Sequence, residues 1–277
     1  MEKQMLSPKE IAETMIGVGT KKAKGKTSHL LLLGVMAGMF IAFGAVGAIV
    51  MGAKVQDPGL SKLLGAAVFP VGLMLVIMAG AELFTGNNLM TIGLLKKEYD
   101  MKALLRNWGL VYVGNFVGSI VVAVLIKSTG LFTGPVGDKA MAIASAKVNI
   151  IAQYGFTGVL SRAILCNIIV VLAVWLAIGA KDTTGRIFAC WFPIMLFVLS
   201  GYEHSIANMF FIPVGMFAGA NITWSQIWLN NLIPVTIGNV IGGAVIVPVI
   251  YYWIYLKEDS KEKEHQMRTS LKPLKKS

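Results

Sequence analysis

Long hydrophobic stretches separated by short polar connections dominate the sequence. Six of them stand out, at 30–53, 63–95, 108–126, 156–180, 187–218 and 228–256. A helix crosses the hydrocarbon core of a bilayer with roughly 20 residues. Four stretches fit one crossing each, whereas the second and fifth are too long for one crossing and too short for two. The pattern predicts an all-α membrane protein with six transmembrane segments, in which the second and fifth helices are broken.

The two overlong stretches carry the same polar spacing. In the second, Glu82 comes two residues after Gly80 and five residues before Asn87. In the fifth, Glu203 stands in the same way between Gly201 and Asn208. Two broken segments with one spacing indicate an internal duplication.

The duplication continues into the next segment of each half. Asn107 and Asn115 in the third segment have the same separation as Asn231 and Asn239 in the sixth. Each half therefore holds three segments, at about 30–127 and 156–256, and an odd number of crossings inverts the second half relative to the first. Inverted repeats with discontinuous helices are typical of transporters and channels, whose sites lie near the midplane.

The charges give the orientation. Only 14% of the 277 residues are charged, against about 25% in an ordinary globular domain. Of the 25 Lys and Arg residues, 19 fall on the side of the two termini and 5 on the other side. The positive-inside rule then places both termini in the cytoplasm. We expect the chain to lie in the cell's inner (cytoplasmic) membrane. The net charge of +11 is a topology signal, and no basic stripe interleaved with aromatics indicates a nucleic-acid partner.

The ends of the chain lie outside the six-span channel domain, which we place at 30–256. Residues 1–29 read as a cytoplasmic amphipathic segment, with Ser7 as a helix cap and Pro8 in the first turn. A helix lying on the inner membrane surface is expected there. Residues 257–277 alternate charges and are expected to form a disordered cytoplasmic tail.

The polar residues of the broken segments are the candidate chemistry. Glu82 and Glu203 would cost several kcal/mol in lipid, so we expect them to accept hydrogen bonds from backbone N–H groups and brace the loops, together with Asn87 and Asn208. His204 is the only histidine within a span, and an imidazole can donate a hydrogen bond or a proton to an anion. Thr85 in the other loop is its natural hydrogen-bonding partner.

Two other classes of membrane protein fit the sequence less well. An intramembrane enzyme needs a nucleophile or a metal set, and Cys166, Cys190 and one midplane histidine do not form one, so no enzyme, cofactor or metal is expected. A water- or glycerol-type channel for neutral solutes has the same architecture, but it usually carries paired Asn-Pro-Ala motifs, which this sequence lacks.

Four blocks of the sequence resemble the formate/nitrite transporter family. The blocks are Ile77–Gly86, Ala163–Ala173, Gly201–Met209 and Asn231–Asn239, and the resemblance runs from about residue 5 to 257. One departure is Val171, where the family usually has Cys. The resemblance implies an aquaporin-like protomer, a homopentamer in the lipid bilayer, and one pore per protomer for small monovalent anions or their acids.

The resemblance also implies roles for single residues. It places Leu83 and Phe84 at a cytoplasmic constriction, Phe69 and Phe197 at an outer one, and Thr85 and His204 between them. Lys147 resembles a lysine that draws anions into the outer vestibule. Asn167 and Asn239 resemble the polar residues beside the central histidine.

The substrate and the role of the histidine stay open in the sequence. A bare anion loses much solvation energy in an apolar constriction, so His204 either gives the anion a proton or acts as an electrostatic donor. The overall likeness, including Thr85-Gly86-Asn87, is nearer to the hydrosulfide-channel branch, with formate and nitrite also permeant. The alternative is that formate or nitrite is the main physiological substrate.

Overall fold

The computed structural model describes residues 5–257, and these are all helical apart from loops and one isolated bridge between Met5 and Ala180. Six helical stretches are long and apolar enough to cross a membrane, as the sequence predicted. They are α2 (Thr27–Ala53), α3 to η1 (Pro58–Gly80), α7 (Met101–Thr129), α9 (Ile150–Gly179), α10 (Thr183–Ser200) and α12 to α14 (Trp224–Tyr255). The expected disordered tail lies outside the described residues, except for Lys257.

The second and fifth segments are broken, which confirms the prediction from their length. The second runs through α3 (Pro58–Val68), α4 (Val71–Leu75) and η1 (Val76–Gly80), leaves helical geometry at 81–83, and resumes in α5 (Phe84–Asn87), η2 (Asn88–Met90) and α6 (Thr91–Leu95). The fifth stops at the end of α10 and resumes in α11 (Ser205–Ala218). Each break leaves a helix N-terminus inside the molecule.

A left-handed glycine ends the first half of each broken helix. Gly80 has a φ of 85° and Gly201 a φ of 75°, a region that residues with a Cβ rarely adopt. The N–H of the following residue then reaches back five residues, from Ala81 to the Val76 carbonyl at 3.0 Å and from Tyr202 to the Phe197 carbonyl at 3.1 Å. This is the Schellman type of helix end, so both breaks are built by the same local device.

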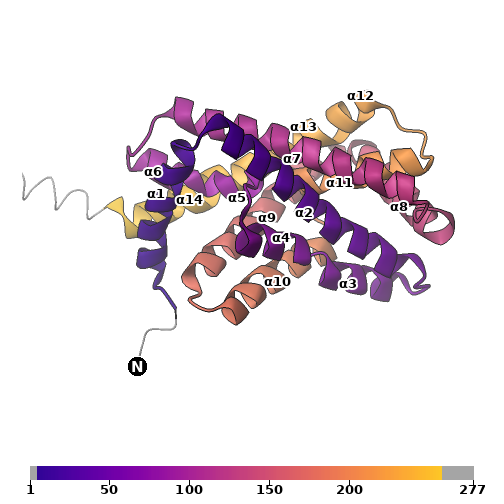
Figure 1. The fold of residues 1–277 in the computed structure, drawn as a ribbon, viewed down its shortest axis with the longest axis horizontal. Helices are drawn as coiled ribbons and strands as arrows, with labels where there is room; N and C mark the ends of the chain where they lie inside the picture. Colours follow the sequence, from indigo (N-terminus) through magenta and orange to yellow (C-terminus); the bar gives the residue numbers. More distant parts are fainter. Residues whose placement is uncertain (1–4, 258–277) are drawn as a thin grey trace, which may run out of the picture.

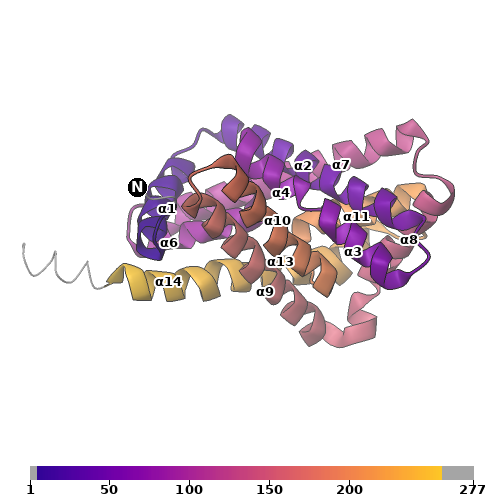
Figure 2. The ribbon, with the colours of Figure 1, turned by 90° about the horizontal axis from the view of Figure 1, so that it is seen from below.

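The molecule is elongated, and its two ends are made of different elements. In Figure 1, α1 (Pro8–Ala23), α6 and α14 (Val247–Tyr255) gather at one end, and α8 (Gly134–Val148) and α12 (Trp224–Ile227) lie at the other. Figure 2 shows the same division from below. The first and last described helices therefore meet at one end, as an even number of crossings requires.

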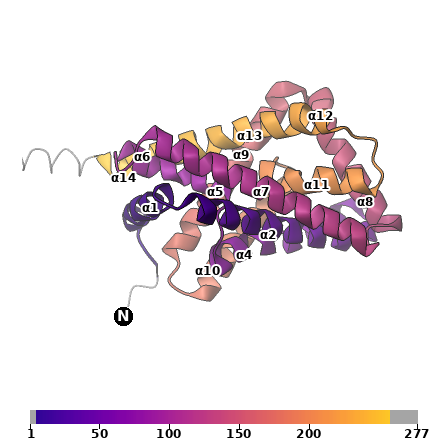
Figure 3. The same cartoon turned by 45° about the horizontal axis from the view of Figure 1, so that its top comes forward.

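Glycines allow the long helices to cross closely. Helices α2 and α7 run side by side along most of their length (Figure 3). A Cβ on Gly38 would lie 2.1 Å from the Asn115 carbonyl oxygen, and one on Gly118 would lie 2.0 Å from that of Val35. In the second half, α9 approaches α13 (Ile233–Val240) and η4 (Ile241–Ile246) in the same way. Small residues at such crossings are the usual means of packing helices in membranes.

Helix α1 corrects one expectation. Its start is as predicted, with Ser7 and Glu10 forming a reciprocal capping box. Its apolar face, however, is buried in protein, because Ile11 and Met15 are at most 3% exposed and pack in one cluster with Trp175 of α9. The helix therefore does not lie on the membrane surface with that face in lipid. Helix α8, in a stretch that we read as a connection, was not predicted at all.

Candidate functional site

The backbone of each break is held by an asparagine from a neighbouring helix. The Asn115 side chain accepts from the Phe84 N–H at 3.0 Å and donates to the Glu82 carbonyl at 2.9 Å. The Asn239 side chain does the same in the second half, accepting from Ser205 N–H at 2.9 Å and donating to the Glu203 carbonyl at 2.9 Å. Both asparagines are fully buried. Together they satisfy backbone groups that would otherwise be exposed at membrane depth.

The glutamates bind side chains instead of backbone, which corrects the expected mode of bracing. Glu82 accepts from Asn87 Nδ2 at 2.6 Å and from Lys22 Nζ at 2.8 Å. The donors to this carboxylate are thus an amide and an ammonium, whereas the Glu82 N–H itself donates to the Leu33 carbonyl at 3.1 Å. A buried carboxylate with a cationic partner and an amide donor is compensated, so it can persist inside the membrane.

Glu203 has the same surroundings in the second half. It accepts from Asn208 Nδ2 at 2.7 Å and from Lys147 Nζ at 3.1 Å. The backbone carbonyl of Lys147 in turn accepts from Asn231 Nδ2 at 3.0 Å. Lys147, which resembles a lysine that draws anions into the vestibule, is therefore ion-paired with Glu203.

Sequence reasoning missed Lys22, the counterpart of Lys147. Its backbone carbonyl accepts from Asn107 Nδ2 at 3.3 Å, just as that of Lys147 accepts from Asn231. Each lysine lies near the C-terminal end of a helix that precedes the first long span of its half, α1 or α8. This pairing extends the duplicated unit outward to include α1 and α8. The sequence did carry a signal for this pairing. In both halves, a basic residue lies in the last turn of a short helix before the first long span.

Thr85 and His204 meet where the two breaks face each other, as expected. Thr85 Oγ1 lies 2.8 Å from His204 Nε2, and both residues are buried. His204 Nδ1 accepts from the Ala207 N–H at 3.2 Å. A neutral imidazole that accepts at Nδ1 carries its hydrogen at Nε2, so His204 donates to the Thr85 hydroxyl. The hydroxyl hydrogen of Thr85 is then free to bind another acceptor.

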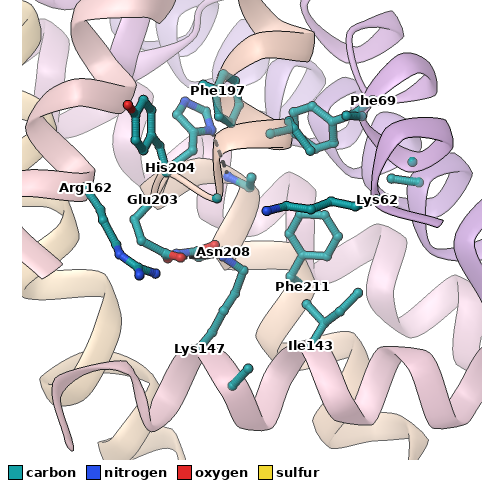
Figure 4. A pocket seen from close by; sticks show the side chains of 18 of the residues that line it. Lys62, Phe69, Ile143, Lys147, Arg162, Phe197, Glu203, His204, Asn208 and Phe211 are labelled. Atoms are coloured by element: carbon teal, nitrogen blue, oxygen red, sulfur yellow. Dashed lines mark hydrogen bonds and ion pairs between the residues drawn. The ribbon is translucent and has the colours of Figure 1, made fainter. Parts of the chain in front are cut away.

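Three cavities follow one another beside His204, because each shares lining residues with the next. The outer cavity has a volume of about 440 Å³ and is lined by Lys62, Phe69, Phe197 and His204 among others (Figure 4). A cavity of about 10 Å³ follows, between Phe69, Phe197, His204 and Leu83. An inner cavity of about 50 Å³, lined by Leu83 and Lys22, lies beyond it.

Apolar side chains separate the cavities. The Phe69 and Phe197 rings meet edge to face at 5.8 Å and line both the outer and the middle cavity. Leu83 lines both the middle and the inner cavity. Phe84 faces the other way, with its ring 5.0 Å from that of Tyr112, and it lines none of the three cavities. The structure therefore separates Phe84 from Leu83, although the resemblance grouped them.

Asn167 joins the two halves behind the contact of Thr85 and His204. Its Nδ2 donates to the Asn88 side chain at 2.7 Å, to the Asn239 carbonyl at 2.7 Å, and at 3.4 Å to the carbonyl of Thr85. Within residues 5–257, no three His, Cys, Asp or Glu side chains gather so that they could hold a metal ion. Cys166 and Cys190 are buried and unpaired with each other.

Known proteins resemble the chain over nearly its full length. Residues 9–253 match the family profile described as formate/nitrite transporter. The chain is 47% identical over 262 residues to an uncharacterized transporter, YrhG, of Bacillus subtilis, with 93% of this chain and 96% of the relative covered. It is 45% identical over 269 residues to a probable formate transporter of Methanothermobacter thermautotrophicus, with 91% and 98% covered.

A solved structure agrees with these matches. A pentameric formate channel with formate bound shares 35% identity and a TM-score of 0.73, with 86% of this chain and 99% of that one covered. The family profile, the similar sequences and the solved structure all cover the part of the chain that holds the six spans and both breaks. The chain therefore belongs to the formate/nitrite transporter family, a family of membrane channels and transporters and not of enzymes.

Proposed function

We propose that the chain is a channel for formate and similar small monovalent anions, or their conjugate acids. The observation that carries this proposal is the position of His204, which bonds to Thr85 and lines both the outer and the middle cavity beside Phe69 and Phe197. The middle cavity of about 10 Å³ admits only small species. A bulky or multiply charged solute would not fit between Phe69, Phe197 and Leu83.

The geometry suits an anion that loses its water. Desolvation disfavours the charged form of an acid, so a carboxylate entering the apolar constriction is driven toward its neutral acid. The Thr85 hydroxyl offers a hydrogen-bond donor at that point, and His204 N–H polarises it from behind. The N-terminus of α11 begins directly after His204 and adds a positive partial charge at the same place. We assign the outer constriction to Phe69 and Phe197 and the inner one to Leu83.

Formate is the substrate that the comparisons favour. The relative from Methanothermobacter thermautotrophicus is named a probable formate transporter, and the similar solved structure is a formate channel with formate bound. Hydrosulfide and nitrite have the same charge and comparable size, so we expect them to pass as well. The likeness of the first loop to the hydrosulfide branch makes hydrosulfide the second candidate.

The assembly and orientation follow the same family pattern. We infer a homopentamer, since the similar solved channel is pentameric and α7 presents an exposed apolar stripe that includes Val113, Val117 and Val124. Native mass spectrometry of the purified protein should give five chains of 29.8 kDa. We place the pentamer in the cytoplasmic membrane with both termini inside.

The deciding experiment is a flux panel on the purified protein in liposomes. Formate, nitrite, hydrosulfide, acetate, lactate and glycerol are compared under the same gradient and pH. We expect fast flux of formate, slower flux of larger acids and no flux of glycerol above that of empty vesicles. Fast glycerol flux without anion flux would overturn the proposal and favour a neutral-solute channel.

A further inference from the structure

The outer cavity is more basic than the inner one. Four basic side chains line it, Lys62, Lys139, Lys147 and Arg162, against the single carboxylate of Glu203. The inner cavity is lined by one basic residue, Lys22, which is paired with Glu82. The two mouths are therefore symmetric in their lysine–glutamate pairs but unequal in charge.

Three of the four outer cations already have partners. Lys147 Nζ lies 3.1 Å from both carboxylate oxygens of Glu203, so the charges of this pair largely cancel. Lys139 Nζ donates to Ser61 Oγ at 3.1 Å. The Arg162 guanidinium lies 3.7 Å from the centre of the Tyr154 ring.

Lys62 is the exception. It lies in the second turn of α3 and is exposed, and within residues 5–257 its ammonium makes no hydrogen bond, ion pair or ring contact. Its side chain reaches into the cavity from the wall opposite Arg162 (Figure 4). Its Nζ lies 3.5 Å from the point where a Cβ on Gly201 would be, next to the outer break. An ammonium without a partner above the constriction is ready to take an anion.

We propose that Lys62 is the anion-capture site of the outer mouth, separate from the Lys147–Glu203 pair. A small monovalent anion binds the Lys62 ammonium beside Gly201 before it meets Phe69 and Phe197. An uncompensated charge at the mouth of a low-dielectric funnel raises the local concentration of anions. This inference rests on the proposed function for the identity of the anion. The effect of the Lys62 charge on the cavity does not depend on that function.

The electrostatic part is tested without any transported substrate. Ala146 is exposed and lines the same cavity, so a cysteine is placed there by Ala146→Cys, and its reaction rates with an anionic and a cationic methanethiosulfonate are compared. We expect Lys62→Met to lower the anionic-to-cationic rate ratio by roughly threefold to tenfold at low salt, and Lys62→Arg to keep it. Lys54→Met removes the same charge from an exposed position outside the cavity and should change the ratio little. Equal effects of the Lys62 and Lys54 changes would overturn the proposal.

The capture part is tested on formate uptake by liposomes at low and high ionic strength. Lys62→Met should raise KM several-fold at low salt, leave the maximal rate unchanged, and approach the unaltered protein at high salt, because salt screens an exposed charge. A lower maximal rate at unchanged KM would assign Lys62 a structural role and refute capture. If the unaltered protein carries no formate, the proposed function fails, and the thiol measurement still decides the charge of the mouth.

Discussion

His204 and Leu83 occupy the same place in their respective halves, and they show where the duplication has diverged. Each is the residue that precedes the first turn of an inner half-helix, α11 or α5. Thr85 corresponds likewise to Ile206, two residues further on. One half thus supplies a ring nitrogen and the other a hydroxyl, so a single hydrogen bond at the centre takes one partner from each half.

We expect His204→Asn to change the pH dependence of formate flux. Protonation of Nδ1 would break its bond from the Ala207 N–H and put a positive charge where the anion passes, so it should hold the anion in place. Asparagine keeps a donor but cannot titrate. The variant should be slower at neutral pH, by roughly tenfold for one weakened hydrogen bond, and its rate should follow only the fraction of formic acid as pH falls.

Initial rates in liposomes between acid and neutral pH test this prediction. His29→Asn is the matched control, since His29 is exposed at the start of α2 and lines none of the three cavities. A pH profile of the His204 variant that is parallel to that of the unaltered protein would exclude a titrating role.

The charges of Lys22 and Glu82 should compensate each other, so that removing one destabilises the protein more than removing both. Lys22→Met leaves a carboxylate that is only 11% exposed without its cation, which should destabilise the protein by about 3 kcal/mol. Adding Glu82→Gln removes the orphaned charge and keeps an acceptor for Asn87, so the double variant should regain most of that loss.

Thermal unfolding in detergent measures both variants. The mirror pair, Lys147→Met with and without Glu203→Gln, should give the same order of stabilities. A double variant no more stable than Lys22→Met would mean that packing of the lysine stem, and not charge, holds α1 in place.

At the scale of single residues, the sequence predicted which polar residues mark the breaks better than it predicted their hydrogen-bonding partners. The spacing of Glu82, Asn87, Glu203 and Asn208 identified the breaks, because a polar residue at membrane depth must have a partner. It could not say that asparagines hold the backbone while glutamates hold lysines. That division depends on which side chain reaches which group after the helices have packed.

Among the helices, the contact between α2 and α7 depends on the absence of side chains. Gly118 of α7 meets the Val35 carbonyl and Gly38 of α2 meets that of Asn115. This contact also sets the position of Asn115, whose side chain must reach the Phe84 N–H in the break. The packing of two long helices is therefore part of the construction of the pore.

Gly118→Ala should separate these helices, whereas Gly109→Ala in the same helix should not. A Cβ at 118 would lie 2.0 Å from a backbone oxygen, while one at 109 meets nothing within 4 Å. Overpacking of this kind costs about 1–3 kcal/mol, which lowers the unfolding temperature by roughly 2–12 °C. Differential scanning fluorimetry of the two variants checks it, and equal melting temperatures would contradict the close contact.

The sequence predicted the six membrane-crossing segments but not every helix or every helix end. The crossings were confirmed because apolar length alone sets them. Helix α3 begins at Pro58, five residues before the apolar stretch that we identified, and so it carries Lys62 on its second turn. Helix α8 was not predicted, because its polar residues interrupt any long apolar stretch.

In the whole molecule, all six crossings run between an end that carries α1, α6 and α14 and an end that carries α8 and α12. The lysine and arginine asymmetry predicts that the first end faces the cytoplasm.

Cysteine labelling in intact cells tests the orientation. Thr133→Cys, in the exposed connection before α8, should react with a membrane-impermeant maleimide added outside, and Lys181→Cys, in the connection before α10, should react only after the cells are opened. Cys166 and Cys190 are buried, so the unaltered protein provides the background. The reverse pattern would place both termini outside.

The contacts that brace each break come from its own half of the chain, and this has a consequence for biosynthesis. Lys22, Glu82, Asn87, Asn107 and Asn115 all precede residue 130, so the first break can close before the second half has left the ribosome. The second half closes in the same way on Lys147, Asn231 and Asn239. The bonds of Thr85 and Asn88 to His204 and Asn167 wait for the halves to dock, as do those of Trp191 to Ala67 and of Tyr112 to Thr236. The pore chemistry is therefore completed last, and a half inserted alone carries a finished scaffold without an open path for anions.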